Sequence, residues 1–403
     1  MGLKYWNGHI VLARLLPFAA LLSLHWPCLV QATEPPASEM PSVQFHGFAS
    51  QALVSTTDNN FFGDSDDGIS TDFTELGVNA SWMANPNWTL AGQLISRQAG
   101  EGDDGRLRLD YGFVHYNPTN GDQDQWNVLI GKTKLPYGFY NETRDVAFTR
   151  PSVLLPQSIY FDRSRDLVLG IVGGQLHGAW QLGGGNLHAQ VAAGRSEVDD
   201  KNIEYAIFLS DRPGSLKSRS TLGARLEYET EGGQTQFALT YGKLRMRYEG
   251  LSDPGFDGGT IKLEPWVLSA RWNGEKISLT GEAARQRRTL QGFPAPFSDD
   301  AYSLAYYLQA TYRLSPTWSM MLRRDVIYSD ENDKDGSTLP IPHLGYSKDW
   351  TLGVQYSINP RWMLAAEWHR VQGTFLLPLA DNPNLGGLKP DWDMWLLQAS
   401  YRF

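Results

Sequence analysis

The chain has 403 residues, of which 41% are hydrophobic and 12% aromatic, and its formal net charge is −9 at pH 7. The acidic balance argues against nucleic-acid binding, which needs a basic surface. The hydrophobic share lies below the roughly 45–50% apolar share that is usual for globular proteins, while Trp and Tyr are abundant, with 14 and 18 copies. Such a composition is expected of a chain whose apolar surface is a thin band instead of a thick core.

The N-terminus predicts a secretory signal peptide over residues 1–32. It carries positive charge but no acidic residue, an apolar run over 15–24, and a small residue for cleavage at Ala32. The run is too short for a membrane anchor, which needs about 20 apolar residues. Residues 33–42 then form a flexible leader. Cys28, the single cysteine, falls in the removed segment, so we expect no disulfide and no thiol ligand in the mature protein.

From residue 43 onward the dominant hydrophobic period is two. Within 302–313, apolar side chains occupy the even positions, and polar ones such as Ser303, Gln309 and Thr311 occupy odd positions. Successive side chains of a strand point to opposite faces, so each such segment has one apolar and one polar face. The pattern predicts sixteen strands, over residues 43–55, 71–83, 88–99, 106–116, 125–133, 166–181, 186–195, 218–230, 234–248, 261–273, 276–288, 302–314, 317–329, 347–358, 361–373 and 391–403.

Three features favour a transmembrane barrel over a soluble β-sandwich, which would show the same alternation. Trp and Tyr cap the apolar faces at the strand ends, tight turns alternate with longer polar connections, and the chain ends in an aromatic residue, Phe403, after an alternating strand. A turn motif with Pro followed two residues later by Trp occurs at 85–88, 315–318 and 359–362. Even strand numbers, short periplasmic turns and long external loops are the rule for bacterial barrels. The sequence therefore predicts an all-β fold, an antiparallel up-and-down transmembrane barrel over 43–403.

Basic residues interrupt the alternation in two of the predicted strands. Arg324 falls on the lipid-facing side of its strand, and Lys243, Arg245 and Arg247 break the pattern of theirs. A β-bulge or an earlier strand end would account for either case.

The last strand places five residues with aromatic ends on one face: Trp395, Leu397, Ala399, Tyr401 and Phe403. This resembles the terminal signature of Gram-negative outer-membrane proteins, and the resemblance implies that Tyr401 and Phe403 are read by the barrel assembly machinery. The strand count and the long fifth connection resemble those of the general porins. The resemblance implies a Gram-negative outer membrane, contact with its lipid and lipopolysaccharide, and a homotrimer.

In general porins the third external loop folds into the lumen and narrows the pore, and residues 134–165 occupy that place here. The run GKTKLPYG at 131–138 resembles that of phosphate-selective porins, and 141–151 resembles porin-like proteins with no assigned substrate. If this loop folds into the lumen, its charged side chains would sieve solutes by size and charge. If it is a solvated external loop, the same charges would do nothing specific. Aromatic residues such as Tyr137 and Phe161 favour packing against the wall. The candidate constriction residues are Lys132, Lys134, Glu142, Arg144, Asp145, Arg150, Asp162, Arg163 and Arg165.

Charged residues near mid-strand have inward parity, and a water-filled lumen tolerates them far better than a soluble core, where an unpaired charge costs several kcal/mol. These lumen-wall candidates are Arg225, Glu227, Glu282, Arg323 and Glu367. Two interpretations stay open: ordinary ion pairs that hold the barrel's shape, or an electrostatic filter in which Arg225 and Arg323 face the acids of the loop. Anion and cation preference both stay open.

Metal and catalytic sites have weaker support. Residues 331–336 approximate half of a calcium loop, but they begin with Glu, and Pro342 stands where the closing Glu should be. His369 near Glu367 is a conceivable catalytic base, yet no Ser lies in a nucleophile elbow. We expect a passive porin for small hydrophilic solutes or ions, without metal or cofactor. The alternatives are an outer-membrane enzyme of the lipase or protease type and a plugged structural barrel.

Overall fold

The barrel is formed by the unit Pro41–Phe403. The predicted signal peptide and almost all of the leader lie outside the described residues. No helix in the described part of the chain is long and apolar enough to cross a membrane. The computed structural model describes residues 42–118, 124–198, 201–208, 212–250, 256, 258–294 and 299–403.

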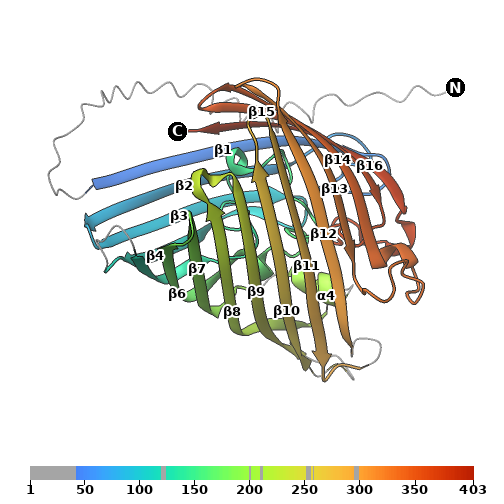
Figure 1. Ribbon diagram of the computed structural model, residues 1–403. Helices are drawn as coiled ribbons and strands as arrows, with labels where there is room; N and C mark the ends of the chain where they lie inside the picture. Colours follow the sequence, from blue (N-terminus) through green and yellow to red (C-terminus); the bar gives the residue numbers. More distant parts are fainter. Residues whose placement is uncertain are drawn as a thin grey trace. The chain divides into compact units, whose positions relative to one another are not determined.

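Sixteen strands of the described residues close into one antiparallel barrel (Figure 1). They are β1 (Ser42–Thr56), β2 (Ser70–Asn85), β3 (Trp88–Ala99), β4 (Asp104–Tyr116), β5 (Asp124–Lys134), β6 (Gly170–Gln181), β7 (Gly185–Arg195), β8 (Gly214–Thr230), β9 (Thr235–Gly250), β10 (Gly258–Asn273), β11 (Ile277–Gln291), β12 (Asp300–Arg313), β13 (Trp318–Tyr328), β14 (Tyr346–Asn359), β15 (Trp362–Gln372) and β16 (Asp391–Arg402). Each strand pairs with its neighbours in sequence, and β1 closes the ring by pairing with β16. The predicted sixteen-stranded up-and-down barrel is therefore confirmed.

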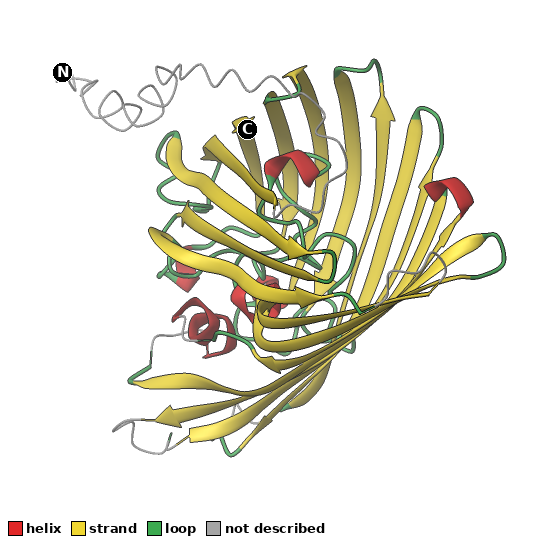
Figure 2. Ribbon diagram, turned by 90° about the vertical axis from the view of Figure 1, so that its left-hand side faces the viewer, coloured by secondary structure: helices red, strands yellow, loops and turns green. Residues whose placement is uncertain are grey.

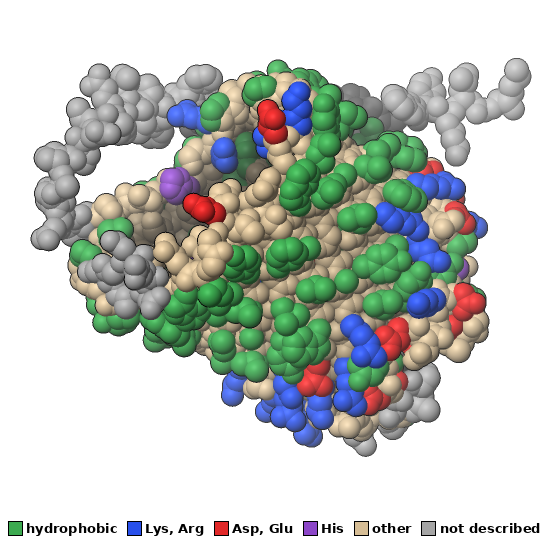
Figure 3. All heavy atoms as spheres, in the orientation of Figure 1, with side chains coloured by type: hydrophobic (Ala, Val, Ile, Leu, Met, Phe, Trp, Pro, Cys, Tyr) green, Lys and Arg blue, Asp and Glu red, His purple; other side chains and the backbone are tan. Residues whose placement is uncertain are grey.

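The two faces of the wall follow the alternation in the sequence. On β10, Val267 and Ser269 are fully buried inside the barrel, whereas Trp266 and Leu268 on the outer face are 50% and 61% exposed. Apolar side chains cover much of the outer wall that faces the viewer in Figure 3. Soluble monomers rarely expose apolar patches of such extent, so the outer wall suits a lipid environment.

The repeated turn motif has the same physical basis at each of its three places. The Asn359 side chain accepts hydrogen bonds from the backbone N–H groups of Arg361 and Trp362, at 2.8 and 3.0 Å. Asn85 and Ser315 accept an equivalent pair in their turns. The Trp that follows each turn packs on a Tyr of the neighbouring strand, with ring centroids 4.4, 4.5 and 4.8 Å apart. Each turn thus carries an aromatic pair at the same end of the barrel.

The chain departs from the predicted strands at residues 166–169. These residues form one helical turn, α3 (Asp166–Leu169), and β6 starts only at Gly170. The prediction of a strand there was wrong because a short apolar run does not distinguish a helix from a strand. The helical turn places Leu167 in an apolar cluster with Phe208 of α4 (Lys201–Phe208), a helix that the sequence did not predict. Short 3-10 turns occur at η1 (Ala147–Thr149), η2 (Glu231–Gly233), η3 (Pro342–Gly345) and η4 (Leu385–Gly387).

The basic residues of β9 keep the strand's alternation. Lys243, Arg245 and Arg247 face outward, while the side chains between them, such as the fully buried Met246, face inward and join the cluster around α4. The β9–β10 register does not shift here, and the shift between β8 and β9 places its extra residue, Arg219, in β8. Since β9 also runs on to Gly250, neither a bulge in β9 nor an early end explains them. At this end of β9 the inner face is apolar because it packs on the cluster around α4. Charged side chains gather on the outer surface at the lower end of the wall in Figure 3.

Arg324 on β13 also faces outward, and its guanidinium lies 5.1 Å from the Trp350 ring centroid on the neighbouring β14. The β13–β14 register is continuous at this pair. A cation over an aromatic face keeps a favourable contact without a carboxylate partner, so this exception also needs no bulge.

Candidate functional site

The connection between β5 and α3, residues 135–165, lies inside the barrel; we call it the inner loop. Arg323 of β13 donates to the Leu154 carbonyl at 3.1 Å, and the Leu154 N–H donates to Glu367 of β15 at 3.1 Å. From another part of the wall, Arg225 of β8 donates to a carbonyl of the same loop at 2.8 Å. Because these wall side chains point into the lumen, the loop crosses the space that the strands enclose (Figure 2).

One anchor of the inner loop is Glu282 of β11. Its buried carboxylate accepts from Tyr160 at 2.6 Å, Tyr307 at 2.8 Å, Ser269 at 2.6 Å and the Phe139 N–H at 3.1 Å. The Tyr160 hydroxyl also accepts from the Phe139 N–H at 2.7 Å. Burial and the neighbouring Glu282 charge raise the pKa of Tyr160 well above its usual value, so its hydroxyl remains a donor. Both ends of the inner loop are thereby tied to one point on the wall.

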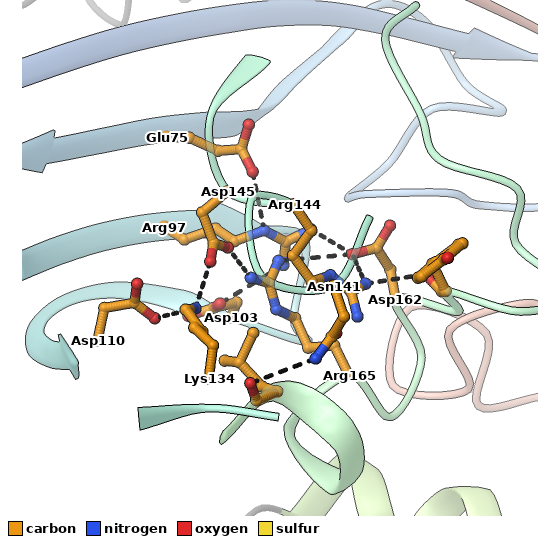
Figure 4. A network of polar contacts seen from close by, with 12 residues as sticks. Glu75, Arg97, Asp103, Asp110, Lys134, Asn141, Arg144, Asp145, Asp162 and Arg165 are labelled. Atoms are coloured by element: carbon orange, nitrogen blue, oxygen red, sulfur yellow. Dashed lines mark hydrogen bonds and ion pairs between the residues drawn. The ribbon is translucent and has the colours of Figure 1, made fainter. Parts of the chain in front are cut away.

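A second anchor joins the loop to β2 and β3 (Figure 4). Arg150 pairs with Glu75 at 2.6 Å, and Arg97 bridges Glu75 at 3.4 Å and Asp162 at 2.9 Å. The side chains of Arg150, Arg97 and Glu75 are all nearly inaccessible to solvent. Breaking a buried pair by removing one partner costs about 3–5 kcal/mol, so these pairs hold the loop firmly once it is in place.

A third group of charges surrounds Asp145 (Figure 4). Lys134 pairs with Asp145 at 2.5 Å and also with Asp110, and Arg165 pairs with Asp145 from the other side. Burial alone would raise the pKa of Asp145, but the charges of Lys134 and Arg165 outweigh it and hold this pKa well below its usual value. Burial, with Arg165 nearby, lowers the pKa of Arg144 to about 10, so Arg144 is charged at neutral pH.

The structure therefore brings six of the predicted constriction residues into one ion-paired network: Lys134, Arg144, Asp145, Arg150, Asp162 and Arg165. Lys132 does not join them. Its partner across the β5–β6 ladder is Val172, which is 52% exposed on the outer face, and its Nζ binds Glu197 at 2.5 Å and the Leu109 carbonyl at 2.6 Å. Strand parity thus directs Lys132 away from the lumen, which the position of the loop motif does not reveal.

The five lumen-wall candidates all face inward, with different partners. Arg225 pairs with Glu142 of the inner loop at 2.6 Å and with Glu227 on its own strand at 3.5 Å. Arg323 instead binds a loop carbonyl and forms no ion pair within 4.0 Å among the described residues. Of the two arginines expected to oppose loop acids, only Arg225 meets one.

Sequence reasoning missed several wall residues that bind the loop. Glu75 and Arg97 carry the second anchor, and Asp325 of β13 accepts from the Ser158 N–H at 3.1 Å. All three are buried charges within strands. The signal that could have found them is the inward parity that singled out Glu282.

No protein-family model matches the sequence, and no curated protein matches it. Solved structures do resemble it. An anion-selective porin from Comamonas acidovorans is 12% identical with a TM-score of 0.57, over 90% of this chain and 100% of that one. The outer-membrane channel DcaP of Acinetobacter baumannii is 14% identical with a TM-score of 0.56, over 90% and 97%. The trimer form of OmpT, an outer-membrane protein of Vibrio cholerae, is 12% identical with a TM-score of 0.54, over 91% and 100%. The chain has the porin fold.

Next to the ion-paired network, this porin-type barrel contains a polar space of about 710 Å³, which we call the vestibule. Its lining includes residues at the external ends of β3 and β4. Positive and negative side chains occur there in equal number, so the lining as a whole favours neither sign of solute. They are Arg97, Arg106, Arg108, Arg163, Arg165, Glu101, Asp103, Asp104, Asp162 and Asp166.

His369, the candidate catalytic base, is fully engaged in the wall of the barrel. Its Nδ1 lies 2.7 Å from Asp349 and its Nε2 lies 3.0 Å from Glu367, and the residue is only 1% exposed. A general base must reach the proton it removes, directly or through one water. With both ring nitrogens held by carboxylates, His369 offers no free nitrogen to a substrate.

The loop at residues 331–336 uses its acids to shape a turn. The Asp333 carboxylate accepts hydrogen bonds from the backbone and hydroxyl groups of Ser337 and Thr338. These bonds, foremost those of Thr338, lower the pKa of Asp333 to about 2. Within the described residues, no group of three His, Cys, Asp or Glu side chains is placed to hold a metal ion.

Proposed function

We propose that the chain is a passive outer-membrane channel for small hydrophilic solutes or ions. The observation that carries this proposal is the inner loop, which is anchored to inward-facing charges on several strands and leaves a charged vestibule beside it. Sixteen to eighteen strands enclose enough space for an aqueous channel. A loop tied across that space narrows the path and sets the charges that a solute must pass.

Single-channel recording in planar bilayers tests the channel. We expect steady ohmic steps in KCl and a defined reversal potential in a salt gradient. A protein that inserts and shows heat-modifiable mobility but passes no current would be a plugged barrel, and the proposal would fail.

We also propose that the barrel is not an enzyme. The support is local: His369 is enclosed between Asp349 and Glu367, which leaves the hydrolase alternative without its base. Turnover of ester or peptide substrates by the purified protein, abolished by His369→Gln, would overturn this.

For partners, we propose a homotrimer in the outer membrane, since one similar barrel is a trimer form. Native mass spectrometry in mild detergent would detect it. The outward-facing Arg245 and Arg247 lie just beyond the apolar band, where phosphate groups of lipopolysaccharide would meet them.

We further propose that Tyr401 and Phe403 carry the assembly signal. Phe403 directly follows β16 and exchanges backbone hydrogen bonds with Gly47 of β1, at 3.0 and 3.2 Å. It therefore lies at the seam where the ring closes. Replacing Phe403 with Ala should lower the amount of assembled barrel in cells more than it lowers stability in vitro.

A further inference from the structure

An apolar cavity of about 140 Å³ lies between the inner loop and the wall formed by β8 to β13. Among the described residues that line it there is no Asp or Glu, while Arg163 and Arg288 are present; Lys243 also borders it, but its side chain faces the outer wall. Aromatic and aliphatic side chains make up most of the rest. They include Tyr137, Phe161, Leu244, Ala284, Ile327 and Phe375.

The wall beside this cavity carries little side-chain bulk on three adjacent strands. Gly223 of β8 lies opposite Gly242 of β9, and both line the cavity with Pro265 of β10. A Cβ on Gly223 would come within 3.1 Å of Leu135 in the inner loop, and one on Gly242 within 2.9 Å of Pro265. The glycines therefore let the loop approach the wall closely here, and the apolar space remains beside that contact.

Arg163 lines this cavity and has no acidic partner among the described residues. Arg288 pairs with Asp299 at 2.5 Å and Lys243 with Glu264 at 3.0 Å, but no described carboxylate lies within ion-pair distance of Arg163. Its Nη1 and Nη2 donate to two backbone carbonyls, and its Nε has no hydrogen-bond partner among the described residues. Its guanidinium also lies 5.3 Å from the Phe375 ring centroid.

A buried guanidinium stays charged, and a buried charge is costly unless it is paired. Burial lowers the pKa of Arg163 to about 10, with Arg288 adding to the shift, so the group is cationic at neutral pH. Arg163 also lines the vestibule. It therefore stands where a solute arriving through the polar space meets the apolar one.

We propose that the cavity is a binding site for a monocyclic aromatic carboxylate, with the ring in the apolar space and the carboxylate at Arg163. A cavity of about 150 Å³ holds one benzene ring, which matches the volume here. Lining cations without acids select an anion over a cation, and a carboxylate would supply the charge and acceptor that Arg163 lacks. The inference rests on the proposed channel function, since it names the class of solute that the channel would carry.

Benzoate is the probe, and its affinity for the folded full-length protein in detergent is measured by isothermal titration calorimetry. We expect benzoate to bind at least tenfold more tightly than benzamide, which lacks the charge, and than acetate, which lacks the ring. Arg163→Gln should lower benzoate affinity at least tenfold and Arg163→Lys less. Ala284→Leu, which fills the cavity, should weaken benzoate but leave acetate unchanged.

The matched control is Arg106→Gln, which removes an exposed vestibule arginine already paired with Asp104 at 2.6 Å and should not change affinity. Equal binding of benzoate and benzamide by the unmodified protein overturns the proposal even if the Arg163 variants fail to fold. So does benzoate binding that Arg163→Gln leaves intact. KCl conductance separates the two claims: current without benzoate selectivity refutes this site alone, and selective binding without current refutes the channel alone.

Discussion

Replacing Glu75 with Gln should loosen the inner loop without opening the barrel. The variant removes the charge that Arg150 contacts at 2.6 Å and Arg97 at 3.4 Å. Arg97 keeps Asp162 as a partner, whereas the partners that Arg150 keeps among the described residues are backbone carbonyls. Leaving one buried cation uncompensated costs about 3–5 kcal/mol. At about 1.4 kcal/mol per factor of ten, the equilibrium between docked and released loop should shift by two to three and a half powers of ten.

Amide hydrogen exchange detected by mass spectrometry reports this shift, because exchange of native-state amides follows local opening. Peptides from residues 147–155 should lose protection by at least a factor of 100, while strand peptides should not change. The control, Glu249→Gln, breaks an exposed pair with Lys217 and Arg219, which is worth at most about 1 kcal/mol. Adding Arg150→Gln to Glu75→Gln should cost less than the two single changes together. Unchanged protection in Glu75→Gln would refute the view that this pair holds the loop.

Three further outcomes are expected. Arg163→Gln should shift the reversal potential toward cations more than Arg144→Gln does, because Arg144 lies near Asp162 at 3.6 Å whereas Arg163 has no acidic partner within the described part of the chain; equal shifts would contradict this. Asp145 has a folded-state pKa far below its ordinary value of about 3.9, so its stabilisation is complete above about pH 5 and is lost as the pH falls below 4. Loop exchange measured from pH 7 to 3 should rise at the acid end, and Asp145→Asn should remove that rise. Asn359→Ala deletes two turn hydrogen bonds and should cost about 1–3 kcal/mol in urea unfolding in vesicles; no change would mean that the motif only spaces the Trp.

The strands could be predicted because the alternation of apolar and polar residues is visible within each segment by itself. A one-residue error would turn every side chain to the other face, so apolar positions fix both the existence and the orientation of a strand. The same parity identified Glu282 and Glu367 as inward-facing. Strand parity also predicts that Lys132 faces outward; its assignment to the constriction followed from the loop motif alone.

The partners of the inward charges could not be predicted in the same way. Arg150 and Glu75 are 75 positions apart in sequence and meet only because the ring closes and the loop enters it. The helix α4 could not be predicted for a related reason, since its apolar residues are buried only by packing against strands β8 to β11. The basic residues on the outside of β9 contradict the expected apolar outer face, and they are explained only once the inner face at that level is known to be apolar.

That basic outer surface has a consequence for how the protein behaves once extracted. Arg245 lies directly across from Lys262, and Arg247 from Lys217, and like charges opposite one another destabilise a strand pair. Neither Arg245 nor Arg247 forms an ion pair with a described residue, so these strand ends depend on anions from their surroundings. In a neutral detergent at low ionic strength the tips of β8 to β10 should fray first, and the choice of buffer anion becomes part of keeping the barrel intact.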